Sequence, residues 1–365
     1  MNILHIIYDD TENPWVGGGG ALRAREINRL LSKKENNICM ITGNFPDARS
    51  CRMDGIQMVR IGYGNNYFLS RLTFTLLLPF YLRKFDFDIV VNEFSVFSPV
   101  FCHWFTRKPV VHTFYHLIGR QAFKKLFIFG IFPYVFEKMF LASARDIITI
   151  SPSVMKEIKK KKPIRRRIEC IYTGVDSELF EVVPVKGEYI AFIGRLDIYM
   201  KGLDVLLKAF KPLLDSKVRL KIAGSGTRKS QSKIESLIAK LGIGANVDLL
   251  GRISDEEKKE FLRKALFLVM PSRYEGWGIA TIEASSCEKP VIGTNILGLK
   301  DAIKDGETGI LVEPDDPLAL STAMRSLLEN ESKRNEMGKS GREWARNFKW
   351  EAIAEKQYAF YEEVV

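Results

Sequence analysis

Two glutamates flank a glycine-rich turn in the second half of the chain. In the stretch YEGWGIATIEASSC, Glu275 comes directly before Gly276, and Glu283 lies eight residues further on, in a segment with helical character. Glycines at a helix start let backbone N–H groups approach an anion closely, and the helix dipole favours negative charge there. Two interpretations compete: the glutamates are solvated residues of a surface helix, or the turn binds a phosphate and each carboxylate reaches sugar hydroxyls.

The spacing of the second glutamate fits a nucleotide. A residue one and a half turns into the helix lies about 7 Å along its axis, which is similar to the distance from a diphosphate to a ribose. A carboxylate at Glu283 could accept hydrogen bonds from both ribose hydroxyls. Glu275, on the other side of the phosphate, would reach the sugar.

Two cations that could pair with a diphosphate follow an earlier apolar run. Arg195 ends the stretch FIGR, and Lys201 comes just before the helical segment 203–210. Arginine offers phosphate oxygens a planar fork and lysine a point charge. Either residue alone would be interpreted as a surface cation, but together they would neutralise a diphosphate.

Three further places could contact a nucleotide. The run GGGG at 17–20 follows the first apolar run and precedes the helical segment 21–31. Gly224, in IAGSGT, permits a tight turn with close backbone approach. Arg252 and Ile253 follow another apolar run, where a base could stack or bond to the backbone. The glycine run alone is also compatible with a flexible loop that binds nothing.

The elements that must position these residues form two series of short apolar runs. The chain has 365 residues and is 46% hydrophobic, enough for two ordinary domains. Near-continuous Val/Ile/Leu runs separated by helical segments indicate parallel strands buried on both faces. The predicted strands are 2–8, 37–43, 87–93, 109–115, 146–152 and 168–172, followed by 189–194, 218–224, 246–251, 266–272, 290–294 and 308–314.

The pattern predicts an α/β protein with two doubly wound, Rossmann-like domains. We expect an N-terminal domain over 1–176, a C-terminal domain over 186–346, and a final helix over 347–365 that crosses back to the first domain. Ligands bind beyond the carboxyl ends of strands in such sheets. Two facing sheets would place both sets of strand ends on a central cleft.

The motifs together resemble a known family. GRLDIYMKG, IAGSG and PSRYEGWGIATIEASSCEKPVIGT, with TGVD at 173–176, look like the retaining nucleotide-sugar glycosyltransferases of the GT-B fold, the group-one or family-four set. The resemblance covers the whole second domain in order, whereas the first domain matches in layout only. It implies a GT-B fold with a donor site in the second domain and an acceptor site in the first.

The resemblance also implies roles on the donor side. Arg195 and Lys201 would hold the diphosphate, Glu283 the ribose, and Glu275 the transferred sugar near its reacting face, as a catalytic residue. Family members normally use no metal, and no cofactor is expected beyond the sugar nucleotide. The remaining donor residues would be Gly18, Gly19 and Gly20 over the phosphates, Trp277, Gly278 and Ile279 at the helix start, and Gly224, Arg252 and Ile253 at the base.

The acceptor side is expected in the first domain. Many relatives carry a histidine after the strand equivalent to PVVHTFY, where this chain has Tyr115. We expect His116 to face the cleft as a catalytic residue, and His112 to be a buried strand residue. Asn92 and Glu93, in NEFSVFSP, either contact the acceptor or cap a loop.

The net charge and the apolar runs of the chain indicate which partners it binds and in which compartment it is found. The net charge of +11 favours anionic partners. The aromatic and basic stretch 119–143 suits a surface helix on anionic lipid, or a core helix with a basic end. No apolar run reaches the ~18 residues of a membrane span, and the N-terminus reads as a strand and not as a signal peptide. We therefore expect a cytoplasmic protein, at the inner face of the membrane if it contacts lipid.

The five cysteines lack metal-type spacing and are expected to be buried thiols.

The sequence thus predicts transfer of a hexose from a UDP- or GDP-sugar to a hydroxyl of a glycan or lipid-linked acceptor, with retention. The alternatives are a non-catalytic nucleotide-sugar binding subunit, an epimerase or a phosphorylase on the same scaffold. Nucleic-acid binding by the basic clusters is disfavoured, and would predict salt-sensitive retention on DNA without sugar-nucleotide specificity.

Overall fold

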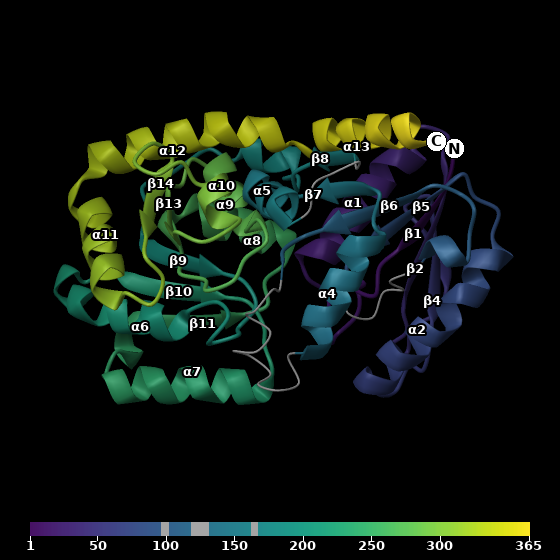
Figure 1. Ribbon diagram of the computed structural model, residues 1–365. Coiled ribbons are helices and arrows are strands. Elements are labelled where there is room, and N and C mark those ends of the chain that lie inside the picture. Colours follow the sequence, from purple (N-terminus) through teal and green to yellow (C-terminus); the bar gives the residue numbers. More distant parts are fainter. Residues whose placement is uncertain (96–101, 118–130, 162–166) are drawn as a thin grey trace. The chain divides into compact units, whose positions relative to one another are not determined.

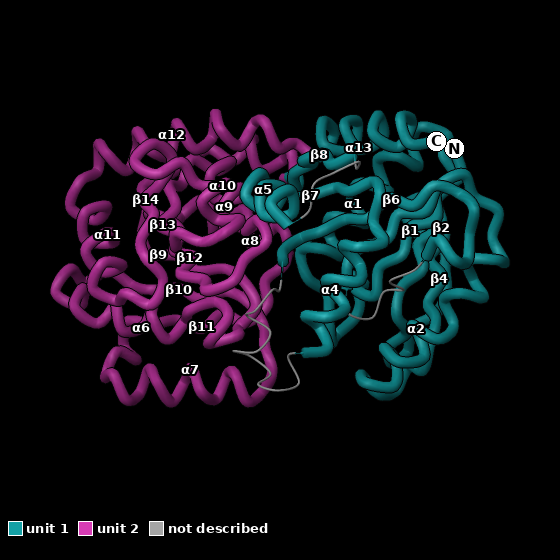
Figure 2. The backbone as a smooth tube through the Cα atoms, viewed as in Figure 1, with its two compact units in different colours: residues 1–174, 350–365 teal, residues 175–349 magenta. Residues whose placement is uncertain are grey.

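The computed structural model describes residues 1–95, 102–117, 131–161 and 167–365, and these fold into two compact units (Figures 1 and 2). Unit 1 comprises residues 1–174 together with 350–365, and unit 2 comprises residues 175–349. The end of the chain therefore belongs to the same unit as its beginning.

Unit 1 is built on a sheet that has eight strands within the described residues, in the order β3-β4-β2-β1-β5-β6-β7-β8. All neighbours are parallel except β3, which runs antiparallel to β4. The six runs predicted as strands in this half are all strands. Their bounds, with β3 and β4, are β1 Asn2–Ile6, β2 Asn37–Gly43, β3 Cys51–Met53, β4 Ile56–Ile61, β5 Ile89–Glu93, β6 Val110–Phe114, β7 Asp146–Thr149 and β8 Arg167–Cys170.

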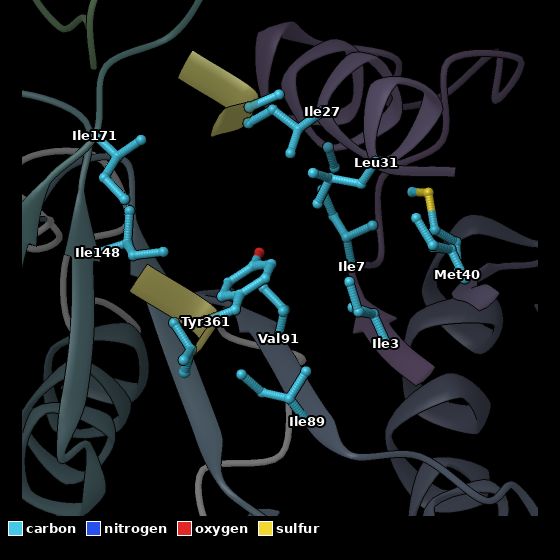
Figure 3. Close-up of a cluster of buried hydrophobic side chains, with 14 of the residues drawn as sticks. Ile3, Ile7, Ile27, Leu31, Met40, Ile89, Val91, Ile148, Ile171 and Tyr361 are labelled. Carbon is cyan, nitrogen blue, oxygen red and sulfur yellow. The ribbon is translucent and has the colours of Figure 1, made fainter. Parts of the chain in front are cut away.

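The helices of unit 1 cover both faces of this sheet. One hydrophobic cluster joins Ile3 of β1 to α1 and α13, and Figure 3 shows its members Ile27 and Leu31 of α1 with Tyr361 of α13. The next residue of β1, Leu4, packs in a second cluster with α2, as expected when successive strand residues point to opposite faces. The helices are α1 Gly19–Ser32, α2 Tyr67–Lys84, α4 Ile131–Ser143, α5 Pro152–Lys161 and α13 Trp350–Val364.

Unit 2 contains a six-stranded parallel sheet in the order β11-β10-β9-β12-β13-β14. Each strand corresponds to one of the six predicted in this half. The strands are β9 Tyr189–Ile193, β10 Arg219–Ala223, β11 Val247–Gly251, β12 Ala265–Met270, β13 Val291–Thr294 and β14 Gly309–Val312. The helices are α6 Leu203–Phe210, α7 Arg228–Leu241, α8 Asp255–Arg263, α9 Ile279–Ser286, α10 Leu299–Ala302, α11 Pro317–Glu329 and α12 Glu331–Ala345.

Two further expectations can be compared with the fold. Over the described ranges, no helix combines the length and the apolar character that a bilayer span requires. All five cysteines are free thiols, and Cys102 and Cys287 are buried as expected. The expectation is wrong for Cys51, which is exposed because it lies on β3, a three-residue strand at the edge of the sheet.

Candidate functional site

The sheet of unit 2 has a topological switch point between β9 and β12. From β9 the chain adds β10 and β11 on one side, then returns to add β12, β13 and β14 on the other. Ligands of doubly wound sheets bind outside the carboxyl ends of the strands at such a reversal. Segment 194–202 follows β9 and segment 271–278 follows β12. The topology therefore places the loops of Lys201 and Glu275 side by side at the switch point.

Lys201 and Glu275 form an ion pair between these two loops. The Lys201 Nζ contacts Glu275 Oε2, and the two side chains are 18% and 16% exposed. Ser272 Oγ donates to the same carboxylate oxygen at 3.4 Å. An ammonium group has three protons to donate, so Lys201 can keep this contact and still bind a phosphate oxygen.

Arg195 is not part of this ion pair. Its side chain is exposed, and within the described part of the chain it makes no ion pair or side-chain hydrogen bond. It follows Gly194, whose N–H donates to the Ala223 carbonyl at 3.0 Å and so joins the ends of β9 and β10. The backbone of Arg195 thus lies at the strand end, and its side chain is exposed to solvent.

Glycine lets the two loops meet at the start of α6. Gly202 is the N-cap of α6 and has φ +64°, a left-handed conformation. A Cβ built on Gly202 would lie 1.9 Å from the Pro271 carbonyl oxygen. The backbone just after Lys201 therefore packs directly on the backbone that leads to Glu275.

Arg273, which the sequence reasoning missed, ties the same loops together. Its guanidinium donates to both carboxylate oxygens of Asp204 at 2.8 Å, to Asp315 at 2.5 Å and to the Tyr199 carbonyl at 2.7 Å. The hydrogen bonds to Asp204, and then those to Asp315, raise the pKa of Arg273 despite partial burial. The sequence feature that could have identified Arg273 is its position in PSRYEGWG, three residues beyond the strand that ends in Met270.

The start of α9 offers backbone N–H groups beside Glu275. Gly278 is the N-cap with φ +76°, and no side chain caps this end. The first N–H groups of a helix have no partner within it, so they can receive an anion. Trp277 is 2% exposed and its ring packs 5.1 Å from that of Phe348. A contact of Trp277 with a diphosphate would therefore have to come from its backbone.

Glu283, within α9, forms a second ion pair. Its Oε1 lies 2.8 Å from Lys258 Nζ of α8, and the side chains are 11% and 19% exposed. Burial lowers the pKa of Lys258, but the charge of Glu283 and hydrogen bonds to Glu283 and Asp255 outweigh it, so the net shift is upward. Lys258 was also missed, because nothing in a separation of 25 residues indicates the pair.

The end of β10 lies between those of β9 and β11. Gly224 has φ +140°, and a Cβ there would lie 1.8 Å from the Gly194 carbonyl oxygen. Its N–H donates to the Gly251 carbonyl at 2.7 Å. Arg252 is exposed and Ile253 is partly buried just beyond β11, the edge strand. The three strand ends are thus joined by backbone contacts.

The glycine run of unit 1 stands at the start of α1. Gly18 is the N-cap and the helix begins at Gly19. The Tyr115 hydroxyl donates to the Gly20 carbonyl at 3.1 Å, and a Cβ on Gly20 would lie 3.2 Å from the Tyr115 ring. Burial, and then the Glu93 carboxylate, raise the pKa of Tyr115, so the phenol keeps its proton. Tyr115, a predicted acceptor-side residue, thus packs on the helix start whose glycines are predicted to lie over the donor phosphates.

Asn92 and Glu93 lie within the strand predicted at 87–93, and the alternative that they cap a loop is wrong. They are the last two residues of β5, with exposures of 0% and 2%. Glu93 Oε1 lies 2.9 Å from His5 Nε2, and Asn92 Nδ2 donates to Cys102 Sγ at 3.2 Å. Both side chains face the interior because β5 is a central strand covered on both sides.

The two histidines near Tyr115 differ in their surroundings. His112 lies in β6, is 2% exposed and packs 4.8 Å from the Phe140 ring, so it is buried as predicted. His116 is exposed, two residues beyond β6. Of the aromatic and basic stretch 119–143, residues 119–130 lie outside the described residues and the remainder forms α4.

Two family models match the chain in succession. The model described as Glycosyltransferase Family 4 matches residues 17–179, and the one described as Glycosyl transferases group 1 matches residues 178–344. The boundary between them falls close to that between the two units at Val175.

Curated relatives match part of their length. An uncharacterised glycosyltransferase of Methanocaldococcus jannaschii is 33% identical over 63% of this chain and 62% of its own. A D-inositol 3-phosphate glycosyltransferase of Corynebacterium diphtheriae is 34% identical over 49% of this chain and 43% of its own. The matched segments thus span less than two thirds of either relative.

Solved structures match the whole chain. The sucrose-phosphate synthase from Thermosynechococcus elongatus has a TM-score of 0.87 at 23% identity, covering 100% of this chain and 98% of that one. HepE of Anabaena in complex with UDP-glucose has a TM-score of 0.80 at 15% identity and covers 100% of both chains. At these identities the likeness shows the fold alone, and it confirms the predicted α/β class with two parallel-sheet domains. That the domains face a common cleft stays a prediction.

Proposed function

Because the chain belongs to the group-one, family-four glycosyltransferases and has their GT-B fold, we propose that it transfers a hexose from a nucleoside-diphosphate sugar to an acceptor hydroxyl with retention of configuration. The observation that carries the proposal is the Lys201–Glu275 ion pair at the switch point of unit 2, next to the start of α9, which no side chain caps. That arrangement offers a cation and backbone N–H groups to an anion, and a carboxylate to a sugar.

The proposed donor is a UDP-sugar, with a GDP-sugar as the alternative. The UDP-glucose complex of the similarly folded HepE supports a uridine donor. Glu283 would hold the ribose hydroxyls, and its pairing with Lys258 keeps the carboxylate oriented. Gly224, Arg252 and Ile253 would contact the base at the ends of β10 and β11.

In the proposed reaction, the acceptor oxygen forms a bond to the anomeric carbon while the bond from that carbon to the diphosphate oxygen breaks. Negative charge builds up on the leaving diphosphate. Arg195, Lys201 and the N–H groups at Gly278 and Ile279 would stabilise that charge by preorganised electrostatics, without a metal. The acceptor hydroxyl would give its proton to the leaving phosphate on the same face of the sugar, which retains configuration. Glu275 would position the sugar.

The proposed acceptor is a glycan or a lipid-linked glycan that binds unit 1. His116 supports this location, because it is exposed just beyond β6. Tyr115, which packs on Gly20, is proposed to contact the acceptor, and the glycines at 18–20 are proposed to lie over the donor phosphates. The net charge of +11 favours an acceptor that carries or adjoins negative charge.

The first test is a thermal-shift screen with UDP, GDP, ADP and their hexose conjugates, followed by product analysis. A ligand that binds only the folded state stabilises it by mass action, about 2.7 kcal/mol at one hundred times its Kd. We expect a uridine ligand to raise the melting temperature most. A non-catalytic subunit would bind the sugar nucleotide without releasing UDP, and an epimerase would return an epimeric sugar nucleotide.

The second test removes the proposed phosphate cation. We expect Lys201→Ala to lower kcat/KM at least about a hundredfold, because one preorganised donor to a developing anion contributes about 10²–10³ in rate. The matched control is Lys208→Ala, an exposed lysine in the last turn of α6, which should retain full activity. A folded Lys201→Ala protein with undiminished transfer would refute the site.

A further inference from the structure

Helix α2 of unit 1 carries a buried stripe and, on the opposite side, an exposed apolar stripe. The buried stripe repeats every four residues as Ser70, Phe74, Leu78 and Leu82. A second stripe with the same repeat is shifted by two residues, or about 200° around the helix. It consists of Phe68, Leu72, Leu76 and Phe80, which are 67%, 45%, 61% and 71% exposed. A surface helix normally has polar residues on that side.

The exposed stripe is not needed for the fold of unit 1. The buried stripe packs against the sheet with Leu4, Ile6 and Val90. The helix start is secured by Asn66, whose side-chain oxygen accepts from the N–H groups of Phe68 and Leu69 at 3.0 Å each. The outward side chains therefore form an apolar surface that neither packing nor capping explains. Figure 1 shows α2 in dark blue.

The charges of α2 are all of one sign. The helix contains no aspartate or glutamate, and its basic residues are Arg71, Arg83 and Lys84. Arg83 and Lys84 are exposed at the C-terminal end of the helix. Exposed tyrosines stand near the other end, Tyr63 at 49% and Tyr67 at 42%. Apolar side chains with lysine and arginine beside them, and tyrosines at one end, match the chemistry of an anionic lipid–water interface.

We propose that α2 is the surface by which this protein lies on an anionic bilayer, with Phe68, Leu72, Leu76 and Phe80 inserted at the headgroup level and Arg83 and Lys84 on lipid phosphates. The helix lies on the bilayer and does not cross it, because its other side is packed on the sheet of unit 1. The sequence placed this contact at 119–143, of which residues 119–130 lie outside the described residues, so that location stays a prediction beside the apolar face of α2.

The inference adds to the proposed function a means of reaching a lipid-linked acceptor, but lipid binding itself does not depend on sugar transfer. A second copy of the chain is the competing occupant of an apolar face. The charge of α2 argues against a self-complementary contact, because two copies of a helix without acidic residues would bring like charges together.

The test is flotation of the full-length protein with vesicles of phosphatidylglycerol and phosphatidylcholine, and with vesicles of phosphatidylcholine alone. We expect binding to the anionic vesicles, and a loss of at least about tenfold in Leu76→Gln/Phe80→Gln, since insertion scales with the apolar area buried. The matched control is Leu318→Gln, which removes a side chain that is 77% exposed on α11 of unit 2, and it should float like the unchanged protein.

A second variant tests the charge. Arg83→Gln/Lys84→Gln should weaken binding to anionic vesicles about fivefold for each charge removed, with no effect on neutral ones. Three results would overturn the proposal: no flotation of the unchanged protein, equal flotation of Leu76→Gln/Phe80→Gln, or a lipid-free dimer by light scattering that this variant dissociates. All α2 variants should keep the thermal shift that the nucleotide induces, and Lys201→Ala should still float with anionic vesicles. These two results allow a failure of the lipid-binding proposal to be distinguished from a failure of the proposed function.

Discussion

At the scale of single residues, the two ion pairs of the candidate site, Lys201–Glu275 and Lys258–Glu283, hold carboxylates in place in the absence of a ligand. Glu275 is held by Lys201 and Glu283 by Lys258, and all four side chains are less than one-fifth exposed. Removing one partner of such a pair leaves a desolvated charge without compensation, which costs more than the pair itself contributes. Each pair therefore has a stability effect that can be measured apart from catalysis.

We predict that Lys258→Met lowers the free energy of unfolding by about 1–3 kcal/mol, because it leaves the Glu283 carboxylate without its charged donor. The KM for the donor should change more than kcat, since Glu283 is proposed to bind the ribose. Lys259→Met, its neighbour in α8, removes a pair with the well-exposed Glu178 and should cost much less. Denaturant titrations of the unchanged protein and the two variants measure the free energies of unfolding. An equal loss of unfolding free energy in Lys258→Met and Lys259→Met would contradict the prediction.

The same pair predicts a pH dependence. The pKa of Lys258 is raised in the folded state, so its contribution to stability is fully present below the unfolded lysine pKa of about 10.4. It is lost only as the pH rises through the higher folded value. The difference in unfolding free energy between Lys258→Met and the unchanged protein should thus stay constant from about pH 6 to about pH 9. A difference that shrinks within that range would show that Lys258 titrates early.

At the scale of elements, the loops after β9 and β12 are joined by backbone contact and by Arg273. Gly202 provides the close approach to Pro271, and Arg273 connects Asp204 of α6 to Asp315 near the start of α11. The position of Lys201 thus depends on a glycine and an arginine that do not themselves contact a phosphate.

We predict that Gly202→Ala destabilises unit 2 and lowers transfer activity. An alanine at this position would have to adopt a left-handed backbone conformation. Its Cβ would also lie 1.9 Å from the Pro271 carbonyl oxygen, which is an overlap. Gly242→Ala is the control, because Gly242 has φ +69° with nothing within 4 Å of the added Cβ. The control should cost about 1–2 kcal/mol from backbone conformation alone and leave kcat/KM unchanged. If the two variants match in stability and in activity, the loop contact has no role.

The hairpin of β3 and β4 was not predicted from the sequence. Its turn is Asp54–Gly55, with φ +52° and +81°, which is the Asp-Gly signature of a tight hairpin. β3 was overlooked because it has three residues and two of them are exposed, and β4 was overlooked because Gln57 and Arg60 interrupt its apolar residues. A short edge strand lacks the continuous apolar run by which buried parallel strands are found.

At the scale of the whole molecule, the chain leaves unit 1 at Gly174 and returns at Trp350. The returning helix α13 completes the core of unit 1 with Phe360 and Tyr361, which are 4% and 0% exposed. Gln357 accepts from the buried guanidinium of Arg23 in α1 at 2.6 Å. Unit 1 therefore cannot complete its core until all of unit 2 has been synthesised.

We predict that Phe360→Ala destabilises unit 1 by about 3–5 kcal/mol, the usual cost of removing a buried phenylalanine side chain. Hydrogen exchange read by mass spectrometry should accelerate in β1, β5 and α1, and much less in β9–β14. The reciprocal variant is Leu327→Ala, a fully buried residue of α11 in unit 2, which should accelerate exchange in unit 2 instead. Uniform acceleration by either variant would mean that the two units unfold as one.

The sequence by itself determined the α/β class and twelve of the fourteen strands found in the described residues, and it singled out Arg195, Lys201, Glu275 and Glu283 as candidate donor-side residues, whose roles stay predictions. These follow from local patterns: buried parallel strands are continuous apolar runs, and polar residues at strand ends mark the ligand edge of the sheet. Only the tertiary structure decided which strands are neighbours and hence which loops meet. Three features depend on which elements pack together: the ion pairs between residues far apart in the chain, the burial of Asn92 and Glu93, and the uncovered face of α2. The pairing of distant elements leaves no local pattern in the sequence, whereas burial of a single face does.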